Sequence, residues 1–155
     1  MPGVPPPLDT DDTPADDTPA DDVRADGRIT ALLERQMSLW VSNRDDVGAL
    51  ADWAPDGVLT APRGVRVTPE ELLGVIDGWH RLFTDLRIEL TSWFASGDRS
   101  RLALEWEWHV TRRSDGARST TLDAIVVDLR DGRIVRWAEY FDTFGSVEFD
   151  DPVDT

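Results

Sequence analysis

The sequence predicts an α+β domain in which helices come first and an antiparallel sheet follows. Apolar residues recur at helical spacing up to about residue 83 and alternate with polar residues from about residue 85 onward. Two short glycine-containing turns divide the alternating half into hairpins. This order is typical of an α+β architecture, and a curved sheet wrapped around a helix would form a cone with one open mouth.

Composition narrows the classes of function. A length of 155 residues suits one domain, and a net charge of -15 argues against nucleic acid or anionic membranes as partners. The absence of cysteine excludes disulfides, thiolate metal sites and a cysteine nucleophile, and the absence of lysine excludes a Schiff base. Neither a secretory signal nor an apolar run of about 20 residues is visible, so the cytoplasm is the expected location.

The two ends of the chain are expected to be disordered. Residues 1–27 contain eight Asp against one Arg and repeat the unit Thr-Pro-Ala-Asp-Asp at 13–17 and 18–22. Such a segment buries too little apolar surface to offset its ordering entropy, so we interpret it as a solubilising tail, with docking to a partner as the alternative. Residues 148–155 are also acidic and are expected to fray. The folded domain would therefore span residues 28–147.

Three helices are expected before the sheet. The first begins near Arg28 and presents an apolar stripe that reaches Trp40. A short second helix is expected over residues 45–53, capped by its first two aspartates. The third begins at residues 68–71, Thr-Pro-Glu-Glu, which supply a capping hydroxyl, a proline at the first helical position and a glutamate at the third.

The expected strands are short or alternate with period two. The turns between the last three lie at residues 114–116 and at 131–132. The strands are residues 57–60, 86–90, 102–110, 119–129 and 133–144.

Two motifs carry a resemblance to a known family. Residues 131–142, DGRIVRWAEYFD, resemble the terminal motif of the SnoaL-like branch of the nuclear transport factor 2-like superfamily, where a DGRI turn leads into a W-x-E/D-Y-F-D strand. Residues 50–59, LADWAPDGVL, resemble the family's junction between helix and strand. The resemblance covers residues 28–147 and implies the cone-shaped fold of that superfamily, with a homodimer formed through the outer sheet face. It does not determine function, because this fold serves isomerases, epoxide hydrolases, cyclases and non-catalytic binding domains.

Two carboxyls are predicted to face the interior. Trp137, Glu139 and Phe141 share one face of the last strand, and the two aromatic residues mark that face as core. The resemblance agrees, since a carboxylate at the position of Glu139 is catalytic in limonene epoxide hydrolase-like members. Alternation leaves both faces of the preceding strand open. There the resemblance places Asp123 at the acidic oxyanion-hole position of ketosteroid isomerase-like members.

Glu139 and Asp123 are therefore the predicted catalytic residues. Two carboxyls in an apolar cavity rarely both ionise, so one would donate a proton while the other accepts one. The alternative is that Asp123 only accepts hydrogen bonds from Thr120 or Thr121. Leu59 and Ala61 stand where other branches place a base or a water ligand, so the established mechanisms of those branches do not transfer directly.

The predicted substrate-binding residues are mostly tryptophans, of which the chain has seven. Trp106 and Trp108 replace the Arg and Asp of epoxide hydrolase-like members, and indole faces would stabilise developing positive charge. The alternative is that the tryptophans only fill the core. His109 lies on the opposite face of its strand with Glu105 and Glu107, which favours a surface or dimer role, and no metal is expected. The predicted substrate-binding set is Trp40, Trp79, His80, Phe83, Trp106, Trp108, Trp137 and Phe141.

These observations favour a cofactor-independent cyclase or isomerase. Its substrate would be a large, mostly apolar natural-product intermediate, and the resemblance implies a polyketide-type setting in secondary metabolism and antibiotic biosynthesis. The first alternative is an epoxide hydrolase or hydratase on the same scaffold. The second is a non-catalytic ligand-binding or assembly domain.

Overall fold

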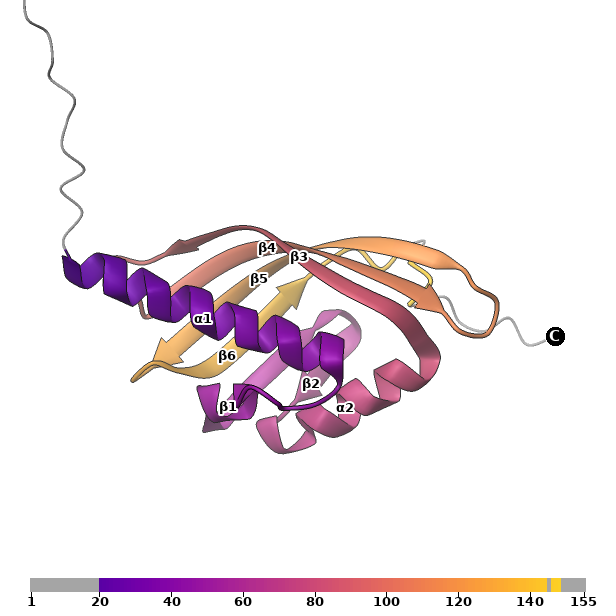
Figure 1. Ribbon diagram of the computed structural model, residues 1–155, viewed down its shortest axis with the longest axis horizontal. Helices are drawn as coiled ribbons and strands as arrows, with labels where there is room; N and C mark the ends of the chain where they lie inside the picture. Colours follow the sequence, from indigo (N-terminus) through magenta and orange to yellow (C-terminus); the bar gives the residue numbers. More distant parts are fainter. Residues whose placement is uncertain (1–19, 145, 149–155) are drawn as a thin grey trace, which may run out of the picture.

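The computed structural model describes residues 20–144 and 146–148, which form two α-helices and one six-stranded sheet (Figure 1). The strand order is β2-β1-β6-β5-β4-β3, and α1 lies across one face of the sheet. Within the described residues, neither helix has the length and hydrophobicity needed to cross a membrane. The elements are α1 (Ala20–Ser42), the 3-10 helix η1 (Ala49–Asp52), β1 (Trp53–Ala61), the 3-10 helix η2 (Pro62–Gly64), β2 (Val65–Val67), α2 (Pro69–Leu82), β3 (Phe83–Ala95), β4 (Arg101–Arg112), β5 (Arg118–Arg130) and β6 (Arg133–Tyr140).

The first helix begins earlier than the sequence predicts. It starts at Ala20 rather than near Arg28, so the last part of the expected tail is helical. Arg99, in the turn between β3 and β4, holds this end of the helix through Asp26 at 3.0 Å and Asp22 at 3.7 Å. Acidic side chains near a helix N-terminus also interact favourably with the helix dipole. The remainder of the predicted tail, residues 1–19, lies outside the described residues.

The prediction of three helices is wrong, because the expected second helix over residues 45–53 is only the four-residue η1. The predicted aspartate cap is only partly right: the N-cap residue is Gly48, but the Asp45 carboxylate accepts hydrogen bonds from the backbone N–H groups of Ala49 and Leu50. The chain then becomes extended at Trp53, four residues before the predicted strand. Trp53 donates its indole N–H to Gln36 of α1 at 3.0 Å, and this buried bond fixes the start of β1.

The start of α2 is confirmed. The Glu71 carboxylate accepts hydrogen bonds from the Thr68 backbone N–H at 2.9 Å and from the Thr68 hydroxyl at 3.0 Å. This is the capping box that the sequence predicts. Leu72 and Ile76 bury the inner face of the helix, and the chain passes directly into β3 at Phe83.

The sheet is mixed rather than wholly antiparallel. Strands β3 to β6 form the predicted antiparallel meander, and its last turn places Asp131 and Gly132 at φ 53° and 74°, the left-handed conformation that this turn requires. However, β1 pairs in parallel with β6, with Leu59 opposite Trp137. A parallel pairing is possible because α2 and four strands separate β1 from β6 in the chain. The last strand ends at Tyr140, four residues short of the prediction.

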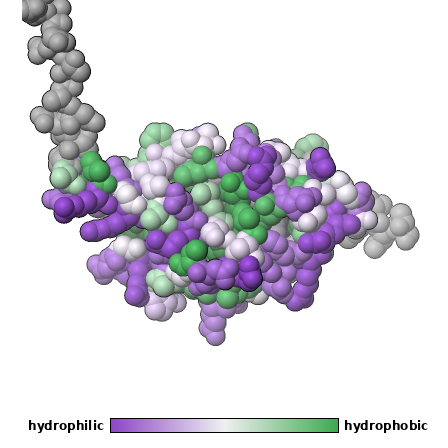
Figure 2. Space-filling model, viewed as in Figure 1, coloured by the Kyte–Doolittle hydropathy of each residue, from purple (hydrophilic) through white to green (hydrophobic). Residues whose placement is uncertain are grey.

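Side-chain alternation divides the sheet into a buried face and an exposed one. The inward residues of β4 and β5 are buried, whereas Glu105 and Leu122 point outward and are exposed. The face of the molecule seen in Figure 2 is mainly hydrophilic with scattered apolar patches. The candidate catalytic and aromatic residues therefore lie on the face that α1 and α2 cover.

Candidate functional site

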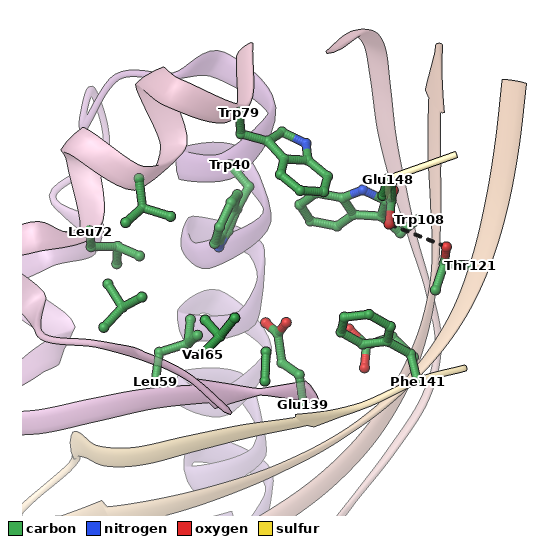
Figure 3. A pocket seen from close by; sticks show the side chains of 14 residues that line it. Trp40, Leu59, Val65, Leu72, Trp79, Trp108, Thr121, Glu139, Phe141 and Glu148 are labelled. Carbon is green, nitrogen blue, oxygen red and sulfur yellow. Dashed lines mark hydrogen bonds between the residues drawn. The ribbon is translucent and has the colours of Figure 1, made fainter. Parts of the chain in front are cut away.

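A cavity of about 190 Å³ lies between the two helices and the inner face of the sheet (Figure 3). Its walls are mostly apolar, and its polar groups are three carboxyls, one hydroxyl and the tryptophan N–H groups. The lining residues are Trp40, Leu59, Ala61, Val65, Val67, Leu72, Val75, Trp79, Trp108, Thr121, Asp123, Glu139, Phe141 and Glu148.

The structure brings Glu139 and Asp123 to this one cavity, as the sequence predicts. Each carboxyl accepts a hydrogen bond from an indole N–H. Trp137 Nε1 donates to Glu139 Oε1 at 2.9 Å, and Trp106 Nε1 donates to Asp123 Oδ2 at 3.1 Å. The two tryptophans are each 1% exposed and do not line the cavity. They therefore orient the carboxyls from behind rather than forming the wall that the sequence predicts for them.

A third carboxyl, Glu148, is absent from the predicted site. Its Oε2 accepts hydrogen bonds from the Ser146 hydroxyl at 3.4 Å and from the Thr121 hydroxyl at a long 3.5 Å (Figure 3). Val147 packs against the core, and Arg112 donates to its carbonyl oxygen at 3.1 Å. The sequence interpretation assigned Glu148 to an acidic, frayed end. The signal that would have found it is Val147, an apolar residue beside a run of acidic ones.

All three carboxyls have raised pKa values. Burial raises the pKa of Glu139 to about 8, and repulsion from Asp123 adds to the effect. Burial raises the pKa of Asp123 to about 7 against the opposing hydrogen bond from Trp106. Burial likewise raises the pKa of Glu148 to about 7. Near neutral pH the cavity therefore holds carboxyls that can donate protons beside carboxylates that can accept them.

Three indoles form one wall of the cavity. Trp108 meets Trp40 with ring centroids 5.3 Å apart and Trp79 with centroids 5.6 Å apart, both at an interplanar angle of 75°. Phe141 lies across the cavity from these rings, near Glu139 (Figure 3). These four aromatic residues line the cavity as the sequence predicts.

Two of the predicted substrate-binding residues lie behind this wall. Phe83 is 4% exposed and packs against Trp79, with ring centroids 4.6 Å apart. His80 places its Nε2 2.7 Å from the carbonyl oxygen of Trp40, so it joins α2 to α1. Neither residue lines the cavity, and both support the tryptophans that do.

Several buried polar atoms at the cavity have no hydrogen-bond partner within the described part of the chain. The donors are Trp79 Nε1 and Trp108 Nε1, and the acceptors are Asp123 Oδ1 and Glu148 Oε1. The Trp108 indole lies close enough to Glu148 to lower its pKa without completing a hydrogen bond of good geometry. Unpaired buried polar atoms are rare in native proteins, so these atoms require a physical explanation.

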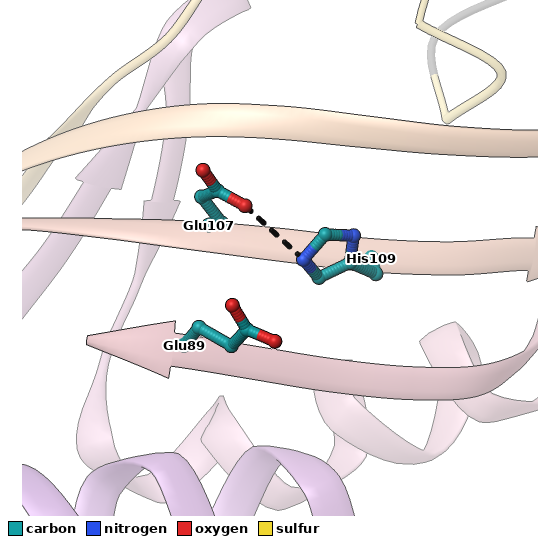
Figure 4. A group of neighbouring side chains, drawn as sticks. All are labelled: Glu89, Glu107 and His109. Atoms are coloured by element: carbon teal, nitrogen blue, oxygen red, sulfur yellow. Dashed lines mark ion pairs between the residues drawn. The ribbon is translucent and has the colours of Figure 1, made fainter. Parts of the chain in front are cut away.

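A second titratable cluster lies on the outer face of the sheet. Side-chain ligand atoms of Glu89, Glu107 and His109 all lie within 4.8 Å of one another (Figure 4). His109 Nε2 is 3.4 Å from Glu107 Oε2, and Glu89 also forms an ion pair with Arg87. Glu105, which the sequence groups with the other two, accepts instead from Ser92 at 3.1 Å. This cluster is outside the cavity and belongs to a different face of the protein.

Fold and site together define a cone-shaped α+β domain with an acidic, aromatic cavity at its mouth. A family model described as a SnoaL-like domain matches residues 33–137, which is most of the chain. The chain therefore belongs to the SnoaL-like family, within the nuclear transport factor 2-like superfamily. No curated protein matches it.

Solved structures support the same fold at low sequence identity. A candidate polyketide cyclase from Xanthomonas campestris pv. campestris is 19% identical with a TM-score of 0.64, covering 76% of this chain and 93% of its own. IdmH, a candidate polyketide cyclase from Streptomyces antibioticus, is 20% identical with a TM-score of 0.61, covering 73% and 91%. A protein with a ketosteroid isomerase-like fold from Catenulispora acidiphila, solved in complex with trimethylamine, is 14% identical with a TM-score of 0.62, covering 72% and 85%.

Proposed function

We propose that this protein is a cofactor-independent cyclase or isomerase that works by carboxylate acid/base catalysis. The observation that carries the proposal is the pair Asp123 and Glu139, two carboxyls in one aromatic cavity with pKa values of about 7 and about 8. General acid–base catalysis is most effective when the catalytic pKa lies near the working pH. The family, and the candidate polyketide cyclases among its structural neighbours, support a reaction of this type.

The chemistry needs only proton transfer. At neutral pH Glu139 keeps its proton and donates it to a carbonyl oxygen of the substrate. Asp123, once ionised, removes a proton from the carbon beside that carbonyl. The result is an enol, which attacks a second electrophilic carbon of the same molecule and closes a ring, or is reprotonated elsewhere to give an isomer. No electrons are transferred to the protein, and the cavity walls hold the chain in a reactive shape.

The size of the cavity refines the expected substrate. About 190 Å³ is below the range of roughly 300–1,000 Å³ typical of sites for drug-sized ligands. The cavity fits one or two rings, so a large polyketide-type molecule would place only its reacting end inside. We therefore propose either a small substrate or a larger one that extends out of the mouth.

The hydrolase alternative is less well supported. It requires a polar group to hold an attacking water, and the positions that serve this role in other branches are Leu59 and Ala61, both of which line the cavity with apolar atoms. Incorporation of ¹⁸O from solvent water into a product would favour the hydrolase over a cyclase.

The direct test is enolisation of a simple ketone. Exchange of the α-hydrogens of 2-tetralone, followed by NMR in D₂O, reports proton transfer without knowledge of the natural substrate. We expect the protein to accelerate exchange, and expect Glu139→Gln or Asp123→Asn to reduce the acceleration by roughly 10²–10⁴-fold. Glu105→Gln, on the outer face, is the matched control and should have no effect.

Equal exchange rates in the wild type and in both cavity variants would remove the two carboxyls from the mechanism. A folded wild type that does not accelerate exchange at all would favour the non-catalytic binding domain.

A further inference from the structure

We infer that the cavity binds an organic ammonium group, held between the carboxyls of Asp123, Glu139 and Glu148 and the ring faces of Trp40, Trp79 and Trp108. This inference deepens the proposed function by naming a feature of the substrate, and it depends on that function only for the claim that the bound molecule is transformed. Three features of the site support it: charge, ring geometry and unpaired atoms.

The charged side chains that line the cavity are all acidic. Three acidic side chains and no basic ones are among the described residues that form the wall. Two basic groups outside the lining are engaged elsewhere: Arg112 pairs with Asp115 and donates to the Val147 carbonyl, and His80 lies against the Trp40 carbonyl. A site built for an anionic substrate would gain from a cationic side chain, whereas this lining complements a cation.

Three aromatic residues line the cavity beside the carboxyls. Trp40 and Trp79 each make an edge-to-face contact with Trp108, at 75° and with ring centroids 5.3 and 5.6 Å from it. Indole rings attract cations placed over their faces. Trp40 and Trp108 are 8% and 7% exposed, so little water competes for these faces.

The unpaired polar atoms specify a second feature of the ligand. Asp123 Oδ1 and Glu148 Oε1 are buried acceptors without partners among residues 20–144 and 146–148, and they suit the positive charge or N–H groups of an ammonium. Trp79 Nε1 is a buried donor without a partner in the described part of the chain, and it needs an oxygen acceptor. Trp108 Nε1 lies beside the Glu148 carboxyl instead. The ligand class is therefore a small amine that also carries a hydroxyl or carbonyl oxygen.

Binding of a cation should release protons. The titratable groups that line the cavity are Asp123 on β5, Glu139 on β6 and Glu148 after β6. The lining residues of α1, β1, β2 and β4 are all neutral. His80 of α2 lies behind the aromatic wall. An ammonium among the three carboxyls stabilises their charged forms and lowers their pKa values. Since these values start at about 7 to 8, affinity for the cation should rise as the pH increases from about 6 to 9.

The test compares choline with its neutral isostere 3,3-dimethylbutan-1-ol, in which carbon replaces the charged nitrogen. Calorimetry with the full chain at pH 8 should show choline binding at least about tenfold more tightly, a difference of about 1.4 kcal/mol. The measurement is made in about 0.3 M NaCl, because a net charge of -15 attracts cations to the surface and salt screens that attraction.

Two variants locate the binding. Glu148→Gln should weaken choline binding about tenfold or more and reduce proton release, yet leave the isostere within about threefold. Trp108→Leu should weaken choline more than the isostere, because it removes the ring face and keeps an apolar wall. Glu105→Gln, a carboxyl removed from the outer face, is the control and should change neither ligand.

The inference is overturned if the isostere binds as tightly as choline, if neither binds the folded protein, or if Glu105→Gln weakens choline as much as Glu148→Gln. Its failure is separable from that of the proposed function. Carboxyl-dependent exchange of 2-tetralone without preference for choline leaves the acid/base enzyme and removes the ammonium site. Preference for choline without any exchange leaves the ammonium site and removes the enzyme.

Discussion

Two buried polar clusters in this protein differ in how completely their atoms are paired. One lies where α1 meets η1 and β1. There Gln36 donates to the Ala49 carbonyl at 2.9 Å and accepts from the Trp53 indole at 3.0 Å, while Arg35 makes two hydrogen bonds of 2.8 Å to Asp52. The other lies at the cavity, where four buried polar atoms have no partner among the described residues and three carboxyls have raised pKa values.

The difference separates structure from function. A fully paired cluster stabilises the fold, since each buried polar group recovers by hydrogen bonding what it loses by leaving water. An unpaired cluster costs stability in the free protein and is retained where a ligand or a reaction uses it. Substitutions in the first cluster should therefore destabilise the protein, whereas neutralising the cavity carboxyls should stabilise it and reduce the proposed proton transfer.

The largest expected effect is on the pH dependence of stability. Carboxyls with raised pKa values hold protons in the folded state that the unfolded state has lost, so the free energy of unfolding falls as pH rises from about 4 to about 8. In the double variant Asp123→Asn/Glu139→Gln, most of this decline should disappear. At pH 8 the variant should be more stable than the wild type by a few kcal/mol, at about 1.4 kcal/mol per pKa unit. Urea denaturation between pH 4.5 and 9 measures this difference.

A matched double variant controls for the loss of two negative charges. Glu34→Gln/Glu105→Gln removes two exposed carboxyls outside the cavity. Its free energy of unfolding should change with pH in the same way as that of the wild type. A cavity variant that is less stable than the wild type at pH 8 would contradict the comparison, because it would mean that the carboxyls hold the fold together.

The paired cluster should respond in the opposite direction. Gln36→Leu keeps the approximate volume but leaves the Trp53 N–H and the Ala49 carbonyl buried without partners, at a cost of about 1–3 kcal/mol each, partly relieved by relaxation. Thr121→Val at the cavity wall removes only a long 3.5 Å contact to Glu148 and should cost less than about 0.5 kcal/mol. Equal losses in these two variants, measured by urea denaturation at pH 7, would refute the distinction between the clusters.

The sequence predicts the residues whose position follows from a local rule. Period-two alternation placed Glu139 inside because Trp137 and Phe141 mark the face, and a capping box marked Thr68. The sequence-based prediction failed where the position of a residue depends on a partner far away in the chain. The start of α1 depends on Arg99, which is far along the chain.

The same distinction holds within the site. Trp106 and Trp108 occupy equivalent positions in the alternating sequence, and both point inward. Only Trp108 lines the cavity, because the Trp106 indole donates a hydrogen bond to Asp123 and lies behind that carboxyl. Glu148 was missed because an acidic terminal segment predicts exposure, and only the packing of Val147 and the Arg112 bond to its carbonyl turn it inward.

An intermediate effect, on the pKa of Asp123, is expected for Trp106, which is buried behind the cavity and bonds to one of its carboxyls. Trp106→Phe keeps a buried ring but removes the N–H that stabilises the charged form of Asp123. The pKa of Asp123 should therefore rise above its present value of about 7. Carbon NMR of the aspartate carboxyls across a pH titration measures the change. Trp93→Phe, a partly buried tryptophan outside the cavity, is the control, and an unchanged or lower pKa in Trp106→Phe would show that the indole does not tune this carboxyl.

The smallest expected effect concerns the ion pairs of Arg99 at the N-terminal end of α1. Arg99→Gln removes the ion pairs to Asp26 and Asp22 that hold the first turns of α1, and glutamine meets the same backbone strain at φ 58° as arginine does. Exposed ion pairs contribute little, so global stability should fall by less than about 1 kcal/mol. Amide hydrogen exchange should quicken over residues 20–27 and stay unchanged from Ile29 onward, where the helix packs on the core. Arg44→Gln, which loses only the exposed pair with Asp46, should leave exchange in α1 unaltered. A loss of global stability as large as that of Gln36→Leu would mean instead that the N-terminal turns of α1 unfold cooperatively with the core. Residues from Ala20 onward would then contribute to the stability of the domain.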